Sequence, residues 1–368
     1  MFVLFFYRQT MEQGRKMKLV LEDGTQFSGE GFGAHCNAVG ELIFNTSMVG
    51  YQEILSDPAY TGQMVVMTYP LMGQYGITAE DNQSKLKGPA ALIVRECCQT
   101  PSNFRYIKTL AEELEEHDTP CVAGLDTRML TRILREKGSV RAAVVDEEAS
   151  VEDALKLIAE TPADPRPVEK VSCRKRWFSR TPQHNFDVVL IDCGVKYGVV
   201  ADLNRKGCNV TIVPHNTSYE DIMAFNPSGV LIAGGPGDPR NLPELVEVIN
   251  RIKGQIPVFG INIGQGLIGL SYGAEVEKLK CGFHGGRAVR NTSSGRIVTA
   301  EANHGYALKA DSVKGTPLTV SYTDVATGTI EGVECEKDRV SAVQFYPEGG
   351  PGPEETLFFD EFVIAMEG

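Results

Sequence analysis

Residues 257–270 constrain the fold of this chain more than any other segment. They read Pro-Val-Phe-Gly-Ile-Asn-Ile-Gly-Gln-Gly-Leu-Ile-Gly-Leu, an apolar strand that enters a helix through a turn flanked by glycines. The glycines let the central residue, Asn262, take a strained backbone that lifts its side chain to the helix N-terminus, where the helix dipole favours an anion. This pattern is typical of a nucleophile elbow. The alternative is an ordinary strand-to-helix junction in which the glycines only permit close packing.

Asn262 is the wrong residue for a nucleophile. A cysteine or serine at an elbow is activated, whereas a carboxamide has no proton that a base could usefully remove and cannot form and release an acyl intermediate. Two thiols, Cys193 and Cys281, fall near the same end of the expected sheet and are the candidates for a substitute. Neither lies on an elbow, which argues against both.

The chain after Phe186 alternates apolar strands with amphipathic helices. This alternation predicts an α/β fold, with a mostly parallel sheet covered by helices on both faces. Ligands of such folds bind at the carboxyl ends of the strands, so the functional residues are expected there. The expected strands are 188–191, 210–213, 230–233 and 258–261, and the expected helices are 196–205, 218–225, 243–253 and 355–366.

The preceding part of the chain predicts a strand-rich domain. From Lys18 to about Val145, short apolar runs are separated by turn signals. Two helices interrupt them, one over residues 108–116 and one that opens at Asp126 and stops at Gly138. Four prolines and a basic stretch then suggest a linker. The predicted boundaries are 17–150 for the first domain, 151–185 for the linker and 186–368 for the α/β domain.

Composition narrows the class of partner. The 368 residues carry a formal net charge of -12, so we expect neither nucleic acid nor an anionic membrane surface as a partner. The nine cysteines show no C-x-x-C pair and no histidine at zinc spacing, which predicts reduced thiols in a cytoplasmic protein without a metal site. The first sixteen residues hold one apolar run too short for a signal peptide or a membrane span, and we exclude them from the fold.

Three further motifs follow expected strands. Residues 233–239, Ala-Gly-Gly-Pro-Gly-Asp-Pro, could aim backbone N–H groups into the same crevice as an oxyanion hole, although a plain tight turn reads the same way. Residues 303–306 read Asn-His-Gly-Tyr, and residues 344–348 read Gln-Phe-Tyr-Pro-Glu. Within the first of these, His304 is more typical of a structural histidine bonded to backbone than of an acid or base. The order and spacing of the motifs are more specific than any one of them.

Together these motifs resemble the small subunit of glutamine-dependent carbamoyl-phosphate synthetase, whose C-terminal domain is a class I glutamine amidotransferase. The resemblance covers about Met17 to Met366. It rests on residues 44–55, 68–71 and 124–128 in the first domain, and on residues 235–239, 303–306 and 346–348, followed by 351–353, in the second.

The resemblance implies roles for particular residues. The family's nucleophilic cysteine falls at Asn262 and its general-base histidine at Tyr346, while Glu348 keeps the glutamate that orients that histidine. The family usually has His-Gln where this chain has Gln265 and Gly266, and that Gln normally contacts the substrate. Glutamine in the family is held by groups that match Ser47, Gly235, Gly237, Ile263, Asn303, Gly305 and Tyr306, with Ile263 in place of the usual leucine.

The expected function follows from these replacements. The resemblance implies a large-subunit partner that carries ATP and Mg and makes carbamoyl phosphate for arginine and pyrimidine synthesis. This chain has no G-x-x-x-x-G-K-[ST] loop, and we expect it to hold no cofactor itself. With its glutaminase defective, the complex would use ammonia. The alternatives are a non-catalytic protein that binds glutamine or a related small molecule, and a hydrolase with an unrecognised nucleophile such as Cys281.

Overall fold

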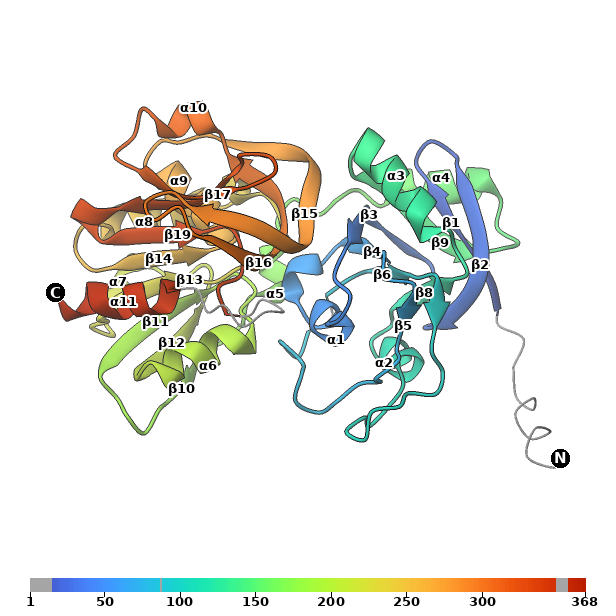
Figure 1. The fold of residues 1–368 in the computed structure, drawn as a ribbon, viewed down its shortest axis with the longest axis horizontal. Helices are drawn as coiled ribbons and strands as arrows, with labels where there is room; N and C mark the ends of the chain where they lie inside the picture. The colour runs from blue at the N-terminus through green and yellow to red at the C-terminus, as the bar shows by residue number, and fades with distance from the viewer. Residues whose placement is uncertain (1–14, 87, 349–356) are drawn as a thin grey trace.

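The computed structural model describes residues 15–86, 88–348 and 357–368. Figure 1 shows a strand-rich N-terminal half and an α/β C-terminal half that lie side by side along the long axis of the molecule. Both predicted fold types are therefore confirmed. The motif at residues 351–353 lies outside the described residues.

Seven strands of the N-terminal half form a closed barrel. Alternation along its first strand explains the packing, because Leu19 and Leu21 join the core of the barrel while Val20 faces a helix outside it. The barrel order is β1 (Arg15–Leu21), β2 (Gln26–Gly33), β8 (Pro120–Ala123), β6 (Ala91–Ile93), β4 (Gln63–Met67), β3 (Ala38–Asn45) and β9 (Val140–Asp146). The other elements are α1 (Tyr51–Leu55), a 3₁₀ helix (Pro58–Tyr60), the paired strands β5 (Leu71–Met72) and β7 (Glu96–Cys97), α2 (Leu110–Glu116) and α3 (Thr127–Lys137).

Helix α3 begins and ends where the sequence predicts. The Asp126 carboxylate accepts a hydrogen bond from the backbone N–H of Met129 at 2.9 Å, which satisfies one of the donors left free at a helix start. Gly138 ends the helix with a φ of 94°, a conformation that glycine adopts without steric cost. Leu130 and Leu134, from the predicted apolar face, are buried in the barrel core.

Residues 151–185, which were predicted to form a linker, contain two helices and a strand. Helix α4 (Val151–Glu160) packs Ala154 and Ile158 against Val20 of the barrel, and a second short helix, α5 (Val168–Val171), follows. Strand β10 (Trp177–Ser179) then pairs antiparallel with a strand of the C-terminal sheet. These elements are hard to predict from the sequence because each is short. The apolar stripe of α4 is brief and surrounded by polar residues, and prolines separate the elements that follow.

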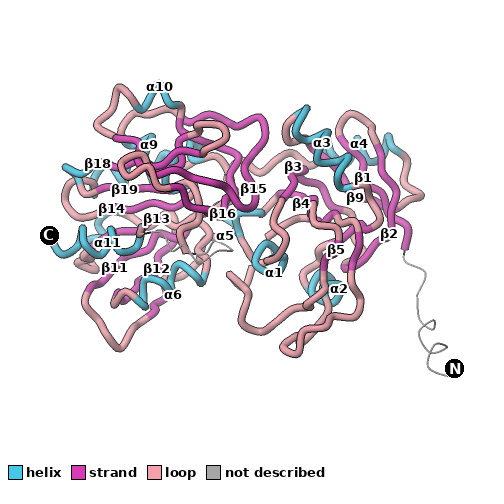
Figure 2. Tube along the Cα trace, viewed as in Figure 1, coloured by secondary structure: helices cyan, strands magenta, loops and turns pink. Residues whose placement is uncertain are grey.

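The C-terminal half is built on a ten-stranded sheet (Figure 2). Five of its strands are parallel, and each expected strand falls on one of them, although the expected strand 230–233 runs one residue past the end of its strand at Ile232. The sheet order is β10, β12 (Cys208–Pro214), β11 (Phe186–Asp192), β13 (Gly229–Ile232), β14 (Val258–Ile261), β19 (Val340–Val343), β18 (Ile330–Cys335), β17 (Thr319–Asp324), β15 (Val276–Asn291) and β16 (Ile297–Leu308).

Helices cover both faces of this sheet, as the alternating pattern predicts. The apolar residues of one face pack against α7 (Tyr219–Met223), α8 (Pro243–Ile252) and α9 (Ile263–Ser271), and those of the other against α6 (Tyr197–Arg205) and α11 (Phe358–Glu367). The last helix was expected from residue 355, but residues 355 and 356 lie outside the described ones. The remaining short elements are a 3₁₀ helix (Pro239–Asn241), α10 (Ala310–Val313) and another 3₁₀ helix (Glu336–Asp338).

The two halves meet where β15 of the sheet lies against β3 of the barrel. The Lys278 ammonium is 2.7 Å from the Glu41 carboxylate across this seam, and the backbone N–H of Ser139 donates to the carbonyl of Lys280 at 3.2 Å. The carboxyl ends of the parallel strands face the barrel at the same place, so residues of both halves surround the crevice.

Candidate functional site

Asn262 sits on the strained turn that the sequence predicts. It lies between β14 and α9 with φ 56° and ψ -113°, in the left-handed half of backbone space that a non-glycine residue rarely adopts. The flanking glycines also serve packing: a Cβ on Gly264 would lie 2.9 Å from the carbonyl oxygen of Ile232, and one on Gly260 would lie 2.8 Å from the carbonyl carbon of Gly264. The elbow and the close packing are therefore both present.

The carboxamide of Asn262 is buried and held at both ends. Its Nδ2 donates to the backbone carbonyl of Asn303 at 2.7 Å, and its Oδ1 accepts from the backbone N–H of Ile263 at 2.6 Å. The whole residue is 3% exposed. An amide in this state offers no nucleophile, and its two hydrogen bonds to the backbone hold it in place.

Tyr346 lies beside Asn262, as the order of the motifs suggests. A Cβ on Gly234 would be 3.1 Å from Cε1 of Tyr346 and 3.3 Å from Cβ of Asn262, so the two side chains flank the same glycine. Burial, followed by the nearby carboxylate of Asp57, raises the pKa of the Tyr346 phenol well above its usual value. The phenol is therefore no general base near neutral pH.

Glu348, the third residue of the expected triad, is paired with a lysine. The Lys196 ammonium is 2.8 Å from the Glu348 carboxylate and 3.8 Å from the centre of the Tyr346 ring. Their side chains are only 12% and 3% exposed. Burial alone would lower the pKa of Lys196, but Glu348 and then Asp57 raise it above its ordinary value, so the ammonium stays charged.

Two more carboxylates complete this buried cluster. Asp57 accepts a hydrogen bond from the backbone N–H of Ala59 at 2.9 Å and lies 3.5 Å from Nδ2 of Asn303. Burial raises the pKa of Asp57 and raises that of Glu301 to about 7. Glu301 accepts a hydrogen bond from the hydroxyl of Ser47 at 3.2 Å. The hydroxyl that was expected to hold glutamine is therefore already bonded within the protein.

Lys196, Asp57 and Glu301 were not among the site residues predicted from the sequence. Lys196 follows the first strand of the parallel sheet at its carboxyl end, which is a signal that could have flagged it. Asp57 stands before Pro58, and an Asp-Pro pair indicates only a turn. Glu301 gave no signal in its own segment, because its partners come from distant parts of the chain.

We expect the free energy of unfolding of Glu301→Gln, measured relative to that of the wild type, to be higher at pH 8 than at pH 5. The folded wild type holds a proton on Glu301 up to a pKa of about 7, against an ordinary value of 4.5, so its free energy of unfolding falls as the pH rises between these values. The variant lacks this loss, which amounts to about 2 to 3 kcal/mol. Urea unfolding at both pH values measures the difference.

Glu277→Gln is the control for this prediction, because it removes an exposed carboxylate from β15 of the same sheet. We expect it to leave the pH dependence of unfolding unchanged. An equal stability difference between wild type and Glu301→Gln at pH 5 and pH 8 would contradict the assignment of the raised pKa to Glu301.

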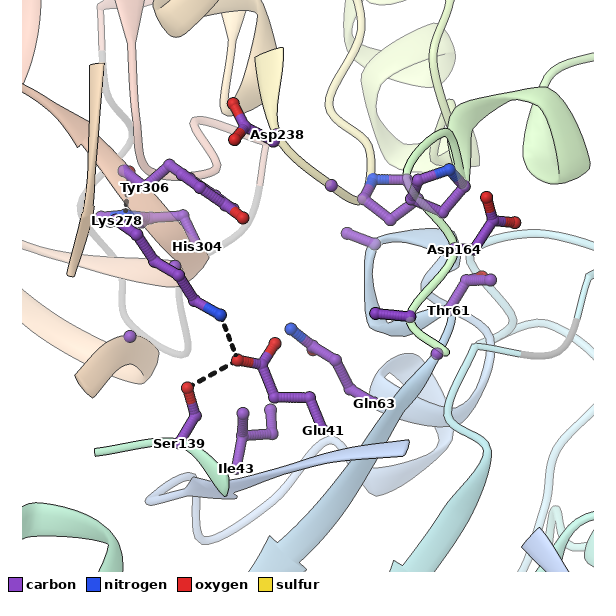
Figure 3. A pocket seen from close by; sticks show the side chains of 18 of the residues that line it. Glu41, Ile43, Thr61, Gln63, Ser139, Asp164, Asp238, Lys278, His304 and Tyr306 are labelled. Carbon is purple, nitrogen blue, oxygen red and sulfur yellow. Dashed lines mark hydrogen bonds and ion pairs between the residues drawn. The ribbon is translucent and has the colours of Figure 1, made fainter. Parts of the chain in front are cut away.

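A cavity of about 660 Å³ opens on the other side of Asn262 and Asn303. Figure 3 shows Lys278 reaching from the sheet to Glu41 of the barrel, with Tyr306 and His304 beside the lysine. The Glu41 carboxylate also accepts a hydrogen bond from the Ser139 hydroxyl. Ser47, Tyr346 and Glu348 do not line this cavity and belong to the buried cluster instead. The predicted residues that do line it are Gly235, Gly237, Asn262, Ile263, Asn303, Gly305 and Tyr306.

Gly266 leaves no room for a longer side chain. A Cβ there would lie 2.6 Å from Cγ of Pro239, so any substitution requires that proline to move. The neighbouring Gln265 is fully buried. The wall of the cavity at this point is therefore formed by the backbone and Pro239.

The remaining candidates have structural surroundings. His304 bonds the backbone carbonyl of Tyr306 through Nδ1 at 3.0 Å, as expected, and its Nε2 lies 3.4 Å from Glu331. Burial raises the pKa of both Cys193 and Cys281 above the usual value for a thiol. Neither cysteine is a ready thiolate nucleophile, which removes the support for a hydrolase that uses one of them.

Within the parts of the chain that are described, the structure contains no helix with the length and apolar character needed to cross a membrane. No group of three or more histidine, cysteine or acidic side chains is placed to hold a metal ion among the same residues.

Comparisons with known proteins place both halves. Residues 19–144 match the model of the carbamoyl-phosphate synthase small chain, CPSase domain, and residues 189–366 match that of glutamine amidotransferase class-I. The carbamoyl phosphate synthase small chain of Oceanobacillus iheyensis is 41% identical over 353 residues, which cover 95% of each chain. That of Fusobacterium nucleatum is 42% identical, covering 94% of this chain and 97% of the relative. A crystal structure of a glutamine amidotransferase from Thermotoga maritima aligns with a TM-score of 0.37 and 20% identity, covering 45% of this chain and 78% of that one.

Proposed function

Because the chain belongs to the family of carbamoyl phosphate synthase small chains, with a small-chain domain followed by a class I glutamine amidotransferase domain, we propose that it serves a complex that takes ammonia from solution. Its partner is a large subunit that binds ATP and Mg and forms carbamoyl phosphate for arginine and pyrimidine synthesis. This chain contributes structure or regulation to the complex and does not hydrolyse glutamine.

The state of Asn262 is the observation that carries this proposal. The elbow is intact, yet its side chain is a carboxamide bonded to Asn303 and Ile263. The residue beside it, Tyr346, is a buried phenol with a raised pKa. A site that lacks both a nucleophile and a base loses about a millionfold in turnover in serine proteases, and we expect a comparable loss here.

A second candidate function is the binding of glutamine or a related small molecule without catalysis. The cavity of about 660 Å³ favours it, because Gly235, Gly305 and Tyr306 line a space large enough for an amino acid. The Ser47 hydroxyl counts against it, since Glu301 already takes its hydrogen bond.

The test is carbamoyl phosphate synthesis by the complex of this chain with its large subunit. We expect synthesis with ammonium and none above background with glutamine. The large subunit alone, assayed with ammonium, shows what this chain adds to the reaction. Synthesis with glutamine as the only nitrogen source would overturn the proposal.

A further inference from the structure

We propose that the side chain of Asn262 is a built-in occupant of a carboxamide-binding site, so that the pocket rejects glutamine as long as Asn262 is present. The inference rests on the proposed function, in which this pocket has lost its catalysis. In addition, the asparagine at position 262 occupies the hydrogen-bonding groups that a ligand amide would use.

The two partners of Asn262 form a pair that suits a primary amide. Such an amide has one oxygen that accepts and one nitrogen that donates two hydrogen bonds. The N–H of Ile263 is one of the donors left without a partner inside helix α9, and the carbonyl of Asn303 is an acceptor at the same elbow. Both face the amide of Asn262 at hydrogen-bond distance, and both residues line the cavity.

The Asn262 residue is held in place by its backbone hydrogen bonds and its neighbours. The backbone N–H of Asn262 donates to the carbonyl of Val343 at 2.8 Å, and its carbonyl accepts from the N–H of Gln265 at 2.9 Å. Gly234 lies against its Cβ, with the Tyr346 ring on the same glycine. The amide therefore has no free direction in which to turn away from its two partners.

A ligand amide must displace this internal one. Displacement leaves the Asn262 amide buried without partners, and each lost hydrogen bond of a buried group weakens binding by roughly 10- to 100-fold. An internal group also needs no association step, which gives it a high effective concentration. Glutamine is therefore excluded in the presence of Asn262 even though the backbone donor and acceptor remain.

Calorimetric titration with L-glutamine tests this inference on the full chain. Asn262→Gly is the first variant, because glycine tolerates the φ of 56° without strain and vacates both partners. We expect it to bind glutamine at least about 10-fold more tightly than the wild type. Glutamate should gain less, because its carboxylate cannot donate to the Asn303 carbonyl. Asn262→Ala repeats the test if the glycine variant does not fold, as judged by circular dichroism.

Asn204→Ala is the matched control. It removes a comparable bond, from Asn204 Nδ2 to the carbonyl of Cys208 at 2.9 Å, away from the elbow, and should bind glutamine as the wild type does. Tight glutamine binding by the wild type, or a folded glycine or alanine variant that binds no better, would overturn the inference. Neither outcome touches the proposed function, which fails only if the wild-type complex uses glutamine for synthesis.

Discussion

Replacing Lys196 with methionine is expected to lower the free energy of unfolding by about 3 to 5 kcal/mol, the cost of removing one partner from a buried ion pair. Lys196 is the cation nearest to Glu348 in the buried cluster, and Asp57 and Glu301 also act on it. Methionine fills most of the same volume but leaves the Glu348 carboxylate, 3% exposed, without its counter-ion. Denaturant unfolding at pH 7.5 measures the change.

Lys309→Met is the control, because Lys309 forms a 2.6 Å ion pair with Glu275 in which the side chains are 46% and 65% exposed. An exposed pair contributes about 0 to 1 kcal/mol, so this variant should stay close to the wild type. Equal effects of the two substitutions would show that Lys196 is not the centre of the cluster.

If the proposed function holds, introducing a cysteine at Asn262 and a histidine at Tyr346 should produce glutamine hydrolysis. In Asn262→Cys/Tyr346→His, the new thiol stands at the N-terminus of α9, where the helix dipole favours a thiolate, and the new imidazole lies against the same glycine, Gly234. The cysteine also vacates the partners of the Asn262 amide. We expect ammonia release from glutamine at least about 1000-fold above the wild type.

Each single variant should remain within about 10-fold of the background, because a nucleophile and its base act as a unit. Asn262→Cys/Tyr346→Phe is the matched control, since it keeps the thiol and an aromatic ring but has no base. A coupled glutamate assay follows the reaction. The expectation fails if the double variant is as silent as the wild type, or if Asn262→Cys alone is as active as the double variant.

The parallel core and the elbow could be predicted because their signals are local. Strand β14 is a continuous apolar run, and the glycines around Asn262 are needed at the turn itself. The caps of α3, Asp126 and Gly138, also act within a few residues of the helix ends. In each of these cases the residues that determine the local structure lie within the same short stretch of sequence.

The buried cluster could not be predicted in the same way. Asp57, Lys196 and Glu301 come from three separate segments and meet only when the barrel docks on the sheet. Closure of the barrel depends likewise on pairing between distant strands, such as β1 with β9. Residue types therefore predicted a pocket. The charges that meet in the buried cluster, and the hydrogen bond from Ser47 to Glu301, could be seen only in the folded structure.

Strand β10 has a consequence for how the chain can be divided. It lies at the end of the ten-stranded sheet and pairs with β12, so that Trp177 sits opposite Ile212. A fragment that starts at Phe186 would leave the backbone amides and carbonyls of β12 open to strands from other molecules, which is a route to aggregation. An expression fragment of the C-terminal half therefore has to begin before Trp177 if it is to stay monomeric.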